Sequence, residues 1–251
     1  MNALLPGAEP WSHHGTSANG ALVLHGFTSN PHSMRGMAEA LAAAGYHVEL
    51  PLLPGHGTVI DDLVPTRWAD WADAADAAYR VVAARAQKVI VVGLSLGGAL
   101  ALRVGADHPE VAGLVCINPA ARPQPPAVVE AAQQMIASGV VLIPGIGSDI
   151  AEPGVTELSY PESALPSMLS IAVDGVANLF PEYPRMRQPL LLINSRQDHV
   201  IEPAESDFLA STYGGPVERL MLERSYHVAT QDYDKDLIVE ATVAFAGRVC
   251  G

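Results

Sequence analysis

Three residues of this sequence have the side chains needed for nucleophilic cleavage of an acyl bond: Ser95, Asp198 and His227. A serine hydroxyl is a weak nucleophile at neutral pH, so a histidine must accept its proton and later return it to the leaving alcohol. A carboxylate is then needed to hold the imidazole in the right tautomer and to stabilise the imidazolium ion. We therefore predict Ser95 as the nucleophile, His227 as the general base and Asp198 as the orienting acid.

The serine lies in a Gly-x-Ser-x-Gly pentapeptide that runs from Gly93 to Gly97. The apolar run 89–92 before it is typical of a buried strand, and the run 99–102 after it favours a helix. When a chain reverses so tightly, the residues two before and two after the serine must lack bulk, which glycine provides. The pentapeptide alone is also compatible with an ordinary glycine-rich turn, so the rest of the sequence must decide.

The predicted acid and base each follow a predicted strand at its carboxyl end. Asp198 comes after the run 190–194, and His227 comes after the run 217–222. The carboxyl ends of parallel strands meet at one edge of a sheet, where ligands bind. The chain order Ser, Asp, His is also the order used by triads of the α/β-hydrolase arrangement.

The sequence contains rivals for two of these roles. Asp207 and Asp232 are alternative carboxylates, but neither directly follows a predicted strand, where this fold places its acid. His199 is an alternative base, although it cannot easily share a side of the chain with its neighbour Asp198.

Acyl transfer also needs an oxyanion hole, because the tetrahedral intermediate carries a negative charge on the former carbonyl oxygen. The backbone N–H of Leu96, at the start of the helix after the serine, is one predicted donor, and the helix dipole adds to it. The second donor should come from the loop after the first strand, which reads His25-Gly26-Phe27-Thr28. We predict the N–H of Phe27.

The elements that must position these residues alternate between strand and helix from residue 21 onward. Strands are expected at residues 21–24, 46–50, 89–92, 113–117, 190–194 and 217–222, after an irregular lead-in with one edge strand, and helices are expected between them and at 234–249. Such alternation predicts the α/β class: a mostly parallel, twisted sheet with helices on both faces.

Residues 119–187 interrupt the alternation. A connection this long without a clear strand is unusual inside a compact domain, so we expect an inserted lid between the two core segments 1–118 and 188–251. Two helices are expected in it, one over 127–138. The second carries an apolar stripe formed by Leu165, Met168, Leu169, Ala172, Val176 and Leu179. This stripe is expected either to line an acyl-chain tunnel or to touch a membrane or lipid aggregate transiently, and both interpretations stay open.

The amino-acid composition limits the kinds of partner that the protein is expected to bind. The 251 residues include 14 Lys and Arg and 27 Asp and Glu, a net charge of −13, which argues against nucleic acid or an anionic bilayer held by charge. A neutral or lipid-like small molecule fits better. Cys116 and Cys250 suggest no disulfide framework, and no residue spacing suggests zinc or another metal. The N-terminal residues lack the charged region of a signal peptide, so a cytoplasmic protein is expected.

The sequence resembles the small bacterial monoacylglycerol lipases and their carboxylesterase relatives. The matching segments span nearly the whole chain: Leu24-His25-Gly26-Phe27-Thr28, Gly55-His56-Gly57, Gly93-Leu94-Ser95-Leu96-Gly97-Gly98, and Ser225-Tyr226-His227-Val228-Ala229-Thr230 followed by Asp232-Tyr233-Asp234. The resemblance implies Ser95, Asp198 and His227 as the triad, and Phe27 and Leu96 as the oxyanion donors. These are the residues reached above from their positions.

Two segments of the expected lid also match the family, and they bear on which substrate is bound. Segments 146–149 and 157–160 resemble lid segments in which an isoleucine and a glutamate help to hold a glycerol head group, which here implies Ile146 and Glu157. Taken alone, Glu157 would be read as a solvated surface carboxylate. In an apolar pocket, however, a carboxylate can orient hydroxyl donors.

The resemblance implies a serine ester hydrolase that cleaves monoacylglycerols to glycerol and fatty acid without metal or organic cofactor. A carboxylesterase of broad specificity for short and medium acyl esters is the alternative. A protein of this fold that only binds a ligand is disfavoured because each catalytic position carries a competent side chain.

Overall fold

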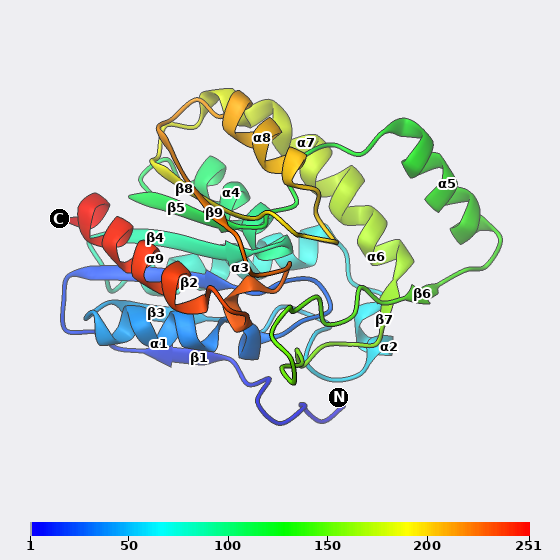
Figure 1. The fold of residues 1–251 in the computed structure, drawn as a ribbon, viewed down its shortest axis with the longest axis horizontal. Helices are drawn as coiled ribbons and strands as arrows, with labels where there is room; N and C mark the ends of the chain where they lie inside the picture. Colours follow the sequence, from blue (N-terminus) through cyan, green and yellow to red (C-terminus); the bar gives the residue numbers. More distant parts are fainter. Residues whose placement is uncertain (1) are drawn as a thin grey trace.

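A computed structural model describes residues 2–251, and a seven-stranded sheet runs through its centre (Figure 1). The strand order is β1-β3-β2-β4-β5-β8-β9, and every neighbouring pair is parallel except β1 and β3. The strands are β1 (Trp11–His13), β2 (Asn19–Leu24), β3 (His47–Leu50), β4 (Lys88–Leu94), β5 (Gly113–Ile117), β8 (Leu190–Ser195) and β9 (Val217–Leu222). The predicted α/β class with a mostly parallel sheet is confirmed.

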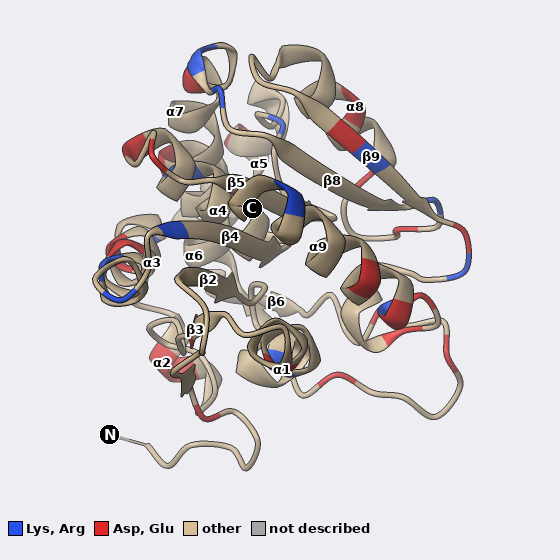
Figure 2. Ribbon diagram, turned by 90° about the vertical axis from the view of Figure 1, so that its left-hand side faces the viewer, with Lys and Arg blue, Asp and Glu red and all other residues tan. Residues whose placement is uncertain are grey.

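Helices cover both faces of this sheet. In Figure 2 the strands are seen between α3 on one side and α1 and α9 on the other. The helices of the two core segments are α1 (Arg35–Ala43), α2 (Ile60–Leu63), α3 (Trp68–Ala83), α4 (Leu96–Asp107), α8 (Pro203–Thr212) and α9 (Lys235–Cys250), with short 3-10 turns at Pro31–Met34 and Ala229–Gln231. Asn30 caps the first of these turns, because its side chain accepts the N–H of His32 at 3.0 Å.

The strands bury side chains on both faces, so the molecule has two apolar cores. In β2, Leu22 and Leu24 belong to the core under α3 and α4, while Ala21 and Val23 belong to the core under α1 and α9. This two-sided burial explains why the central strands read as continuous apolar runs rather than as alternating patterns.

Residues 119–187 lie between β5 and β8 and add no strand to the main sheet; we call them the insertion. It contains α5 (Pro126–Ala137), a small antiparallel pair β6 (Leu142–Pro144) and β7 (Glu162–Ala164), α6 (Leu165–Ser170), a π-helix (Ile171–Val176), α7 (Ala177–Leu179) and a 3-10 turn (Phe180–Arg185). The sequence predicted both helical regions but not the β6–β7 pair or the π-helix. Figure 1 shows α5 projecting away from the sheet.

Candidate active site

Ser95 occupies a sharp turn between β4 and α4. Its backbone has φ 56° and ψ −115°, a positive-φ conformation that residues other than glycine rarely adopt. The flanking glycines are required by space: a Cβ on Gly93 would lie 2.0 Å from the carbonyl oxygen of Gly97, and a Cβ on Gly97 would lie 2.2 Å from that of Leu24. The predicted strand, turn and helix around the serine are therefore present.

The side chains of His227 and Asp198 are hydrogen-bonded to each other and buried. The Nδ1 atom of His227 lies 2.8 Å from Oδ2 of Asp198, and the two side chains are 7% and 2% exposed. The other carboxylate oxygen accepts the backbone N–H groups of Val200 and Ile201, each at 2.8 Å. Because the carboxylate accepts at Nδ1, the Nε2 atom is left as the basic nitrogen. His227 and Ser95 line the same small recess.

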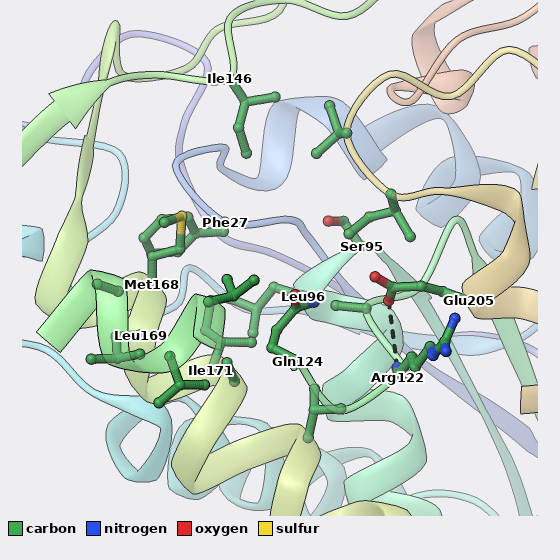
Figure 3. A pocket seen from close by; sticks show the side chains of 18 of the residues that line it. Phe27, Ser95, Leu96, Arg122, Gln124, Ile146, Met168, Leu169, Ile171 and Glu205 are labelled. Atoms are coloured by element: carbon green, nitrogen blue, oxygen red, sulfur yellow. Dashed lines mark hydrogen bonds between the residues drawn. The ribbon is translucent and has the colours of Figure 1, made fainter. Parts of the chain in front are cut away.

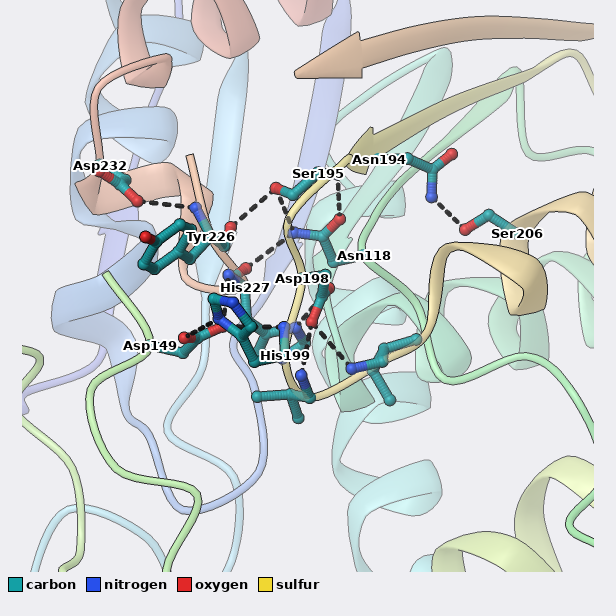
Figure 4. A network of polar contacts seen from close by, with 12 residues as sticks. Asn118, Asp149, Asn194, Ser195, Asp198, His199, Ser206, Tyr226, His227 and Asp232 are labelled. Atoms are coloured by element: carbon teal, nitrogen blue, oxygen red, sulfur yellow. Dashed lines mark hydrogen bonds and ion pairs between the residues drawn. The ribbon is translucent and has the colours of Figure 1, made fainter. Parts of the chain in front are cut away.

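Asn118 and Ser195, which the sequence did not single out, hold the loop that carries His227. The side chain of Asn118 donates to the carbonyl oxygen of His227 at 2.8 Å and to the hydroxyl of Ser195 at 3.1 Å, and that hydroxyl donates to the carbonyl oxygen of Tyr226 at 2.7 Å (Figure 4). Asn118 has φ 44° and is buried. Both residues stand at the carboxyl ends of strands, which is the signal that could have identified them.

The rival side chains lie in other places. Asp207 forms a surface ion pair with Arg219, and the buried carboxylate of Asp232 accepts backbone N–H groups, among them that of Tyr226 at 2.8 Å. His199 is 59% exposed and its Nδ1 lies 2.8 Å from a carboxylate oxygen of Asp149. Of the three carboxylates weighed from the sequence, Asp198 is the one bonded to the imidazole of His227.

The two predicted oxyanion donors belong to residues that line the same cavity as the serine. Leu96 is the first residue of α4, where an N–H has no partner within the helix. Phe27 lies in the loop after β2, and a Cβ on the preceding Gly26 would be 3.6 Å from Cβ of Ser95. Phe27, Leu96 and Ser95 all line one cavity.

Buried His25 fixes the shape of the Phe27 loop. Its Nε2 accepts the N–H of Leu53 at 3.1 Å, so the proton resides on Nδ1, which lies 2.9 Å from the carbonyl oxygen of Gly26. Burial and the neighbouring His56 hold the pKa of His25 well below its usual value. The loop is therefore held by a neutral imidazole.

The larger cavity at Ser95 has a volume of about 480 Å³ and is walled chiefly by apolar side chains from the insertion. Those walls include Met168, Leu169 and Ile171, which are labelled in Figure 3. Ala172 and Val176 also line the cavity. Four members of the predicted apolar stripe are among these lining residues, and the other two, Leu165 and Leu179, are buried. The stripe therefore faces inward, which favours the tunnel interpretation over contact with lipid.

A second, smaller recess also reaches Ser95, and Ile146 and Glu157 are among the residues that line it. The hydroxyl of Ser29 donates to Oε1 of Glu157 at 2.5 Å, and the backbone N–H of Glu157 donates to the hydroxyl of Ser148 at 2.8 Å. Burial raises the pKa of Glu157, opposed by the Ser29 hydrogen bond and by His227. Ile146 is 43% exposed and lines the larger cavity as well as the recess.

Within residues 2–251, no group of three or more His, Cys, Asp or Glu side chains has the geometry to hold a metal ion. In the same residues, no helix combines the length and apolar character needed to cross a membrane. Cys116 and Cys250 are both free and buried.

Comparison with known sequences identifies relatives along the whole chain. The model of the family described as "Alpha/beta hydrolase family" matches residues 21–241. A thermostable monoacylglycerol lipase of Bacillus sp. (strain H-257) is 38% identical over 251 residues, which cover 99% of this chain and 98% of the relative. A carboxylesterase of Bacillus subtilis (strain 168) is 26% identical over 91% of this chain and 92% of the relative.

Comparison with solved structures gives the same fold. One structure, from work on the metagenome-derived lipolytic enzymes LipS and LipT, superimposes with a TM-score of 0.92 and 41% identity, covering 98% of this chain and 100% of the other. The monoacylglycerol lipase of Paleococcus ferrophilus superimposes with a TM-score of 0.75 at 19% identity, covering 96% of this chain and 99% of the other, a likeness of fold alone.

Proposed function

The chain belongs to the alpha/beta hydrolase family, and on that basis we propose that it cleaves monoacylglycerols to glycerol and free fatty acid. It is a hydrolase of the lipase and esterase group, as its similarity to lipolytic enzymes over nearly its full length indicates. The observation that carries the substrate proposal is the pair of spaces that meet at Ser95: a large apolar cavity and a small recess with a carboxylate.

The first chemical step forms an acyl-enzyme. His227 takes the proton of the Ser95 hydroxyl through Nε2 as the oxygen attacks the ester carbonyl, and Asp198 stabilises the resulting imidazolium through Nδ1. The N–H groups of Phe27 and Leu96 stabilise the oxyanion, each being worth roughly 3 kcal/mol in such sites. The imidazolium then protonates the departing glycerol oxygen, and the tetrahedral intermediate collapses.

The second step uses the same groups in reverse. A water molecule takes the place of glycerol, His227 accepts one of its protons, and the hydroxide oxygen attacks the acyl carbonyl. Collapse of the second tetrahedral intermediate returns the proton to Ser95 and releases the fatty acid. No metal or organic cofactor takes part in this scheme.

The two spaces fit the two halves of the substrate. The cavity of about 480 Å³, walled by the insertion, receives the acyl chain. The recess receives the glycerol head, with the carboxylate of Glu157 accepting a glycerol hydroxyl and Ile146 covering the carbon backbone. The insertion is thus the lid of the site, and a lipid ester is the partner that it selects.

The test is a pair of measurements on Ser95→Ala. We expect the variant to lose labelling by a fluorophosphonate and hydrolysis of every ester while its circular dichroism stays native, since only the nucleophile is removed. Retained turnover would refute the mechanism. For the wild-type enzyme, a panel of mono-, di- and triacylglycerols and simple short-chain esters separates a monoacylglycerol lipase from the broad carboxylesterase alternative.

A further inference from the structure

One carboxylate of the insertion contacts both loops that carry the proposed acid and base. Asp149 lies between β6 and β7, and its side chain is 13% exposed. Its Oδ2 accepts the backbone N–H of His227 at 3.0 Å and that of His199 at 3.2 Å. Its Oδ1 accepts the Nδ1 proton of His199 at 2.8 Å. Figure 4 shows these three residues together.

Backbone hydrogen bonds join the same stretch of the insertion to the histidine loop. The N–H of Val228 donates to the carbonyl oxygen of Asp149 at 3.0 Å. The buried carboxylate of Asp232 accepts the N–H of Ala151 at 2.8 Å and that of Tyr226 at 2.8 Å. Residues 149–151 of the insertion and the loop around His227 therefore form one hydrogen-bonded unit.

We propose that Asp149 is a positioning residue that holds the acid and base loops in register. His199 directly follows Asp198, so a carboxylate that binds both His199 and the N–H of His227 fixes the distance between the two loops. Hydrogen bonds from backbone N–H groups to a carboxylate are stronger than those between neutral groups. The inference rests on the proposed roles of Ser95, Asp198 and His227.

The proposal assigns different effects to neighbouring residues of the insertion. Ser148, one position earlier, accepts the N–H of Glu157 and so supports the head-group recess. Asp149 instead supports the groups that move protons. Loss of Asp149 should therefore lower kcat, whereas loss of the Ser148 hydroxyl should raise KM for monoacylglycerols.

The experiment compares Asp149→Asn with the wild-type enzyme. The variant keeps the size of the side chain but replaces one acceptor oxygen by an N–H donor. We expect kcat to fall by about 10-fold to 100-fold with KM within about twofold, because small misplacements of catalytic groups cost rate rather than binding. The rate of fluorophosphonate labelling should fall in parallel, since labelling needs an activated Ser95 but not the head-group recess.

Two further measurements separate positioning from general stability. The proton shared by His227 and Asp198 should give a low-field resonance in the NMR spectrum that moves or broadens in Asp149→Asn. The control Glu130→Gln removes the same charge from an exposed position on α5 and should keep the wild-type rate and resonance. If Asp149→Asn does not fold, Asp149→Glu, which keeps the charge but displaces it by one methylene, should give a reduced kcat.

Wild-type kcat and labelling in the folded Asp149 variants would overturn the inference, as would an effect confined to KM. Such a result in an enzyme that still depends on Ser95 leaves the proposed function intact. By contrast, ester hydrolysis and fluorophosphonate labelling that persist in Ser95→Ala would refute the proposed function itself.

Discussion

At the scale of single residues, the site is built from side chains held by partners remote in sequence. The bond between Asn118 and Ser195 spans 77 positions, and that between Ser29 and Glu157 spans 128. Each aims a polar group that would be costly to bury without a partner. The roles of such residues depend on contacts that no local pattern encodes.

Glu157 provides a prediction at this scale. Glu157→Gln should raise KM for monoacylglycerols by about 10-fold, because a hydrogen bond to a charged acceptor is worth roughly 1.5–3 kcal/mol. Turnover of a p-nitrophenyl ester, which offers no glycerol hydroxyl, should change by less than about twofold. The control is Glu162→Gln at an exposed position of β7. An equal loss of activity on both substrates would contradict a role for Glu157 in holding the glycerol head group.

Some parts of the site follow directly from the sequence at the residue scale. The serine pentapeptide and the strand ends before Asp198 and His227 carry local signals, so their placement was predictable. Asn118 and Ser195 also stand at strand ends, but their hydrogen-bond partners come together only in the folded chain. Asp149 lies between β6 and β7, where the sequence carries no such signal. The catalytic roles themselves stay predictions until Ser95→Ala is measured.

At the scale of elements, sharply bounded apolar runs are the best predicted. The sequence placed β5 and β9 at the residues where the structure has them, because glycine or proline stands at or beside each start. It missed the π-helix at Ile171–Val176, since an apolar stripe at helical spacing does not distinguish a regular helix from one with a widened turn. It also missed the short β6–β7 pair, which is only three residues a side.

The π-helix contributes Ile171, Ala172 and Val176 to the lining of the large cavity, which we propose receives the acyl chain, so a change there should alter chain-length preference. Ala172→Trp should lower kcat/KM for long-chain monoacylglycerols by about 10-fold or more and leave short-chain esters within about twofold, because the indole fills space needed by distal methylenes. The control is Ala177→Trp, on the exposed side of α7. A uniform loss across chain lengths would argue against this division of the cavity.

At the scale of the whole molecule, two buried neutral histidines link stability to pH. Burial lowers the pKa of His56 to about 4, opposed by hydrogen bonds to the backbone of residues 53 and 54, and the pKa of His25 is also well below its usual value. In the unfolded chain a histidine titrates near 6.5. Below that pH the unfolded chain therefore binds more protons than the folded one.

His56 should accordingly contribute stability that is complete above about pH 6.5 and is lost as pH falls toward about 4. The loss amounts to roughly 3 kcal/mol. Denaturant unfolding of His56→Gln across this range should show a slope shallower by up to about 1.4 kcal/mol per pH unit. The matched change His14→Gln removes an exposed histidine and serves as control. Identical slopes in wild type and His56→Gln would contradict the assignment.

The fit of the π-helix against its neighbour has a consequence for how the chain tolerates length changes. Gly175 packs so closely on Trp68 that an added Cβ would lie 2.5 Å from the indole, which fixes the angular phase of the helix after the wide turn. A π-helical turn holds one residue more than an α-helical turn, so removing one residue from 171–174 would restore regular α-helical winding and leave the residues on either side close to their present phase. Met168 and Leu169 would then stay on the cavity wall. A single deletion in this turn would thus shorten the chain without turning the helix that lines the cavity.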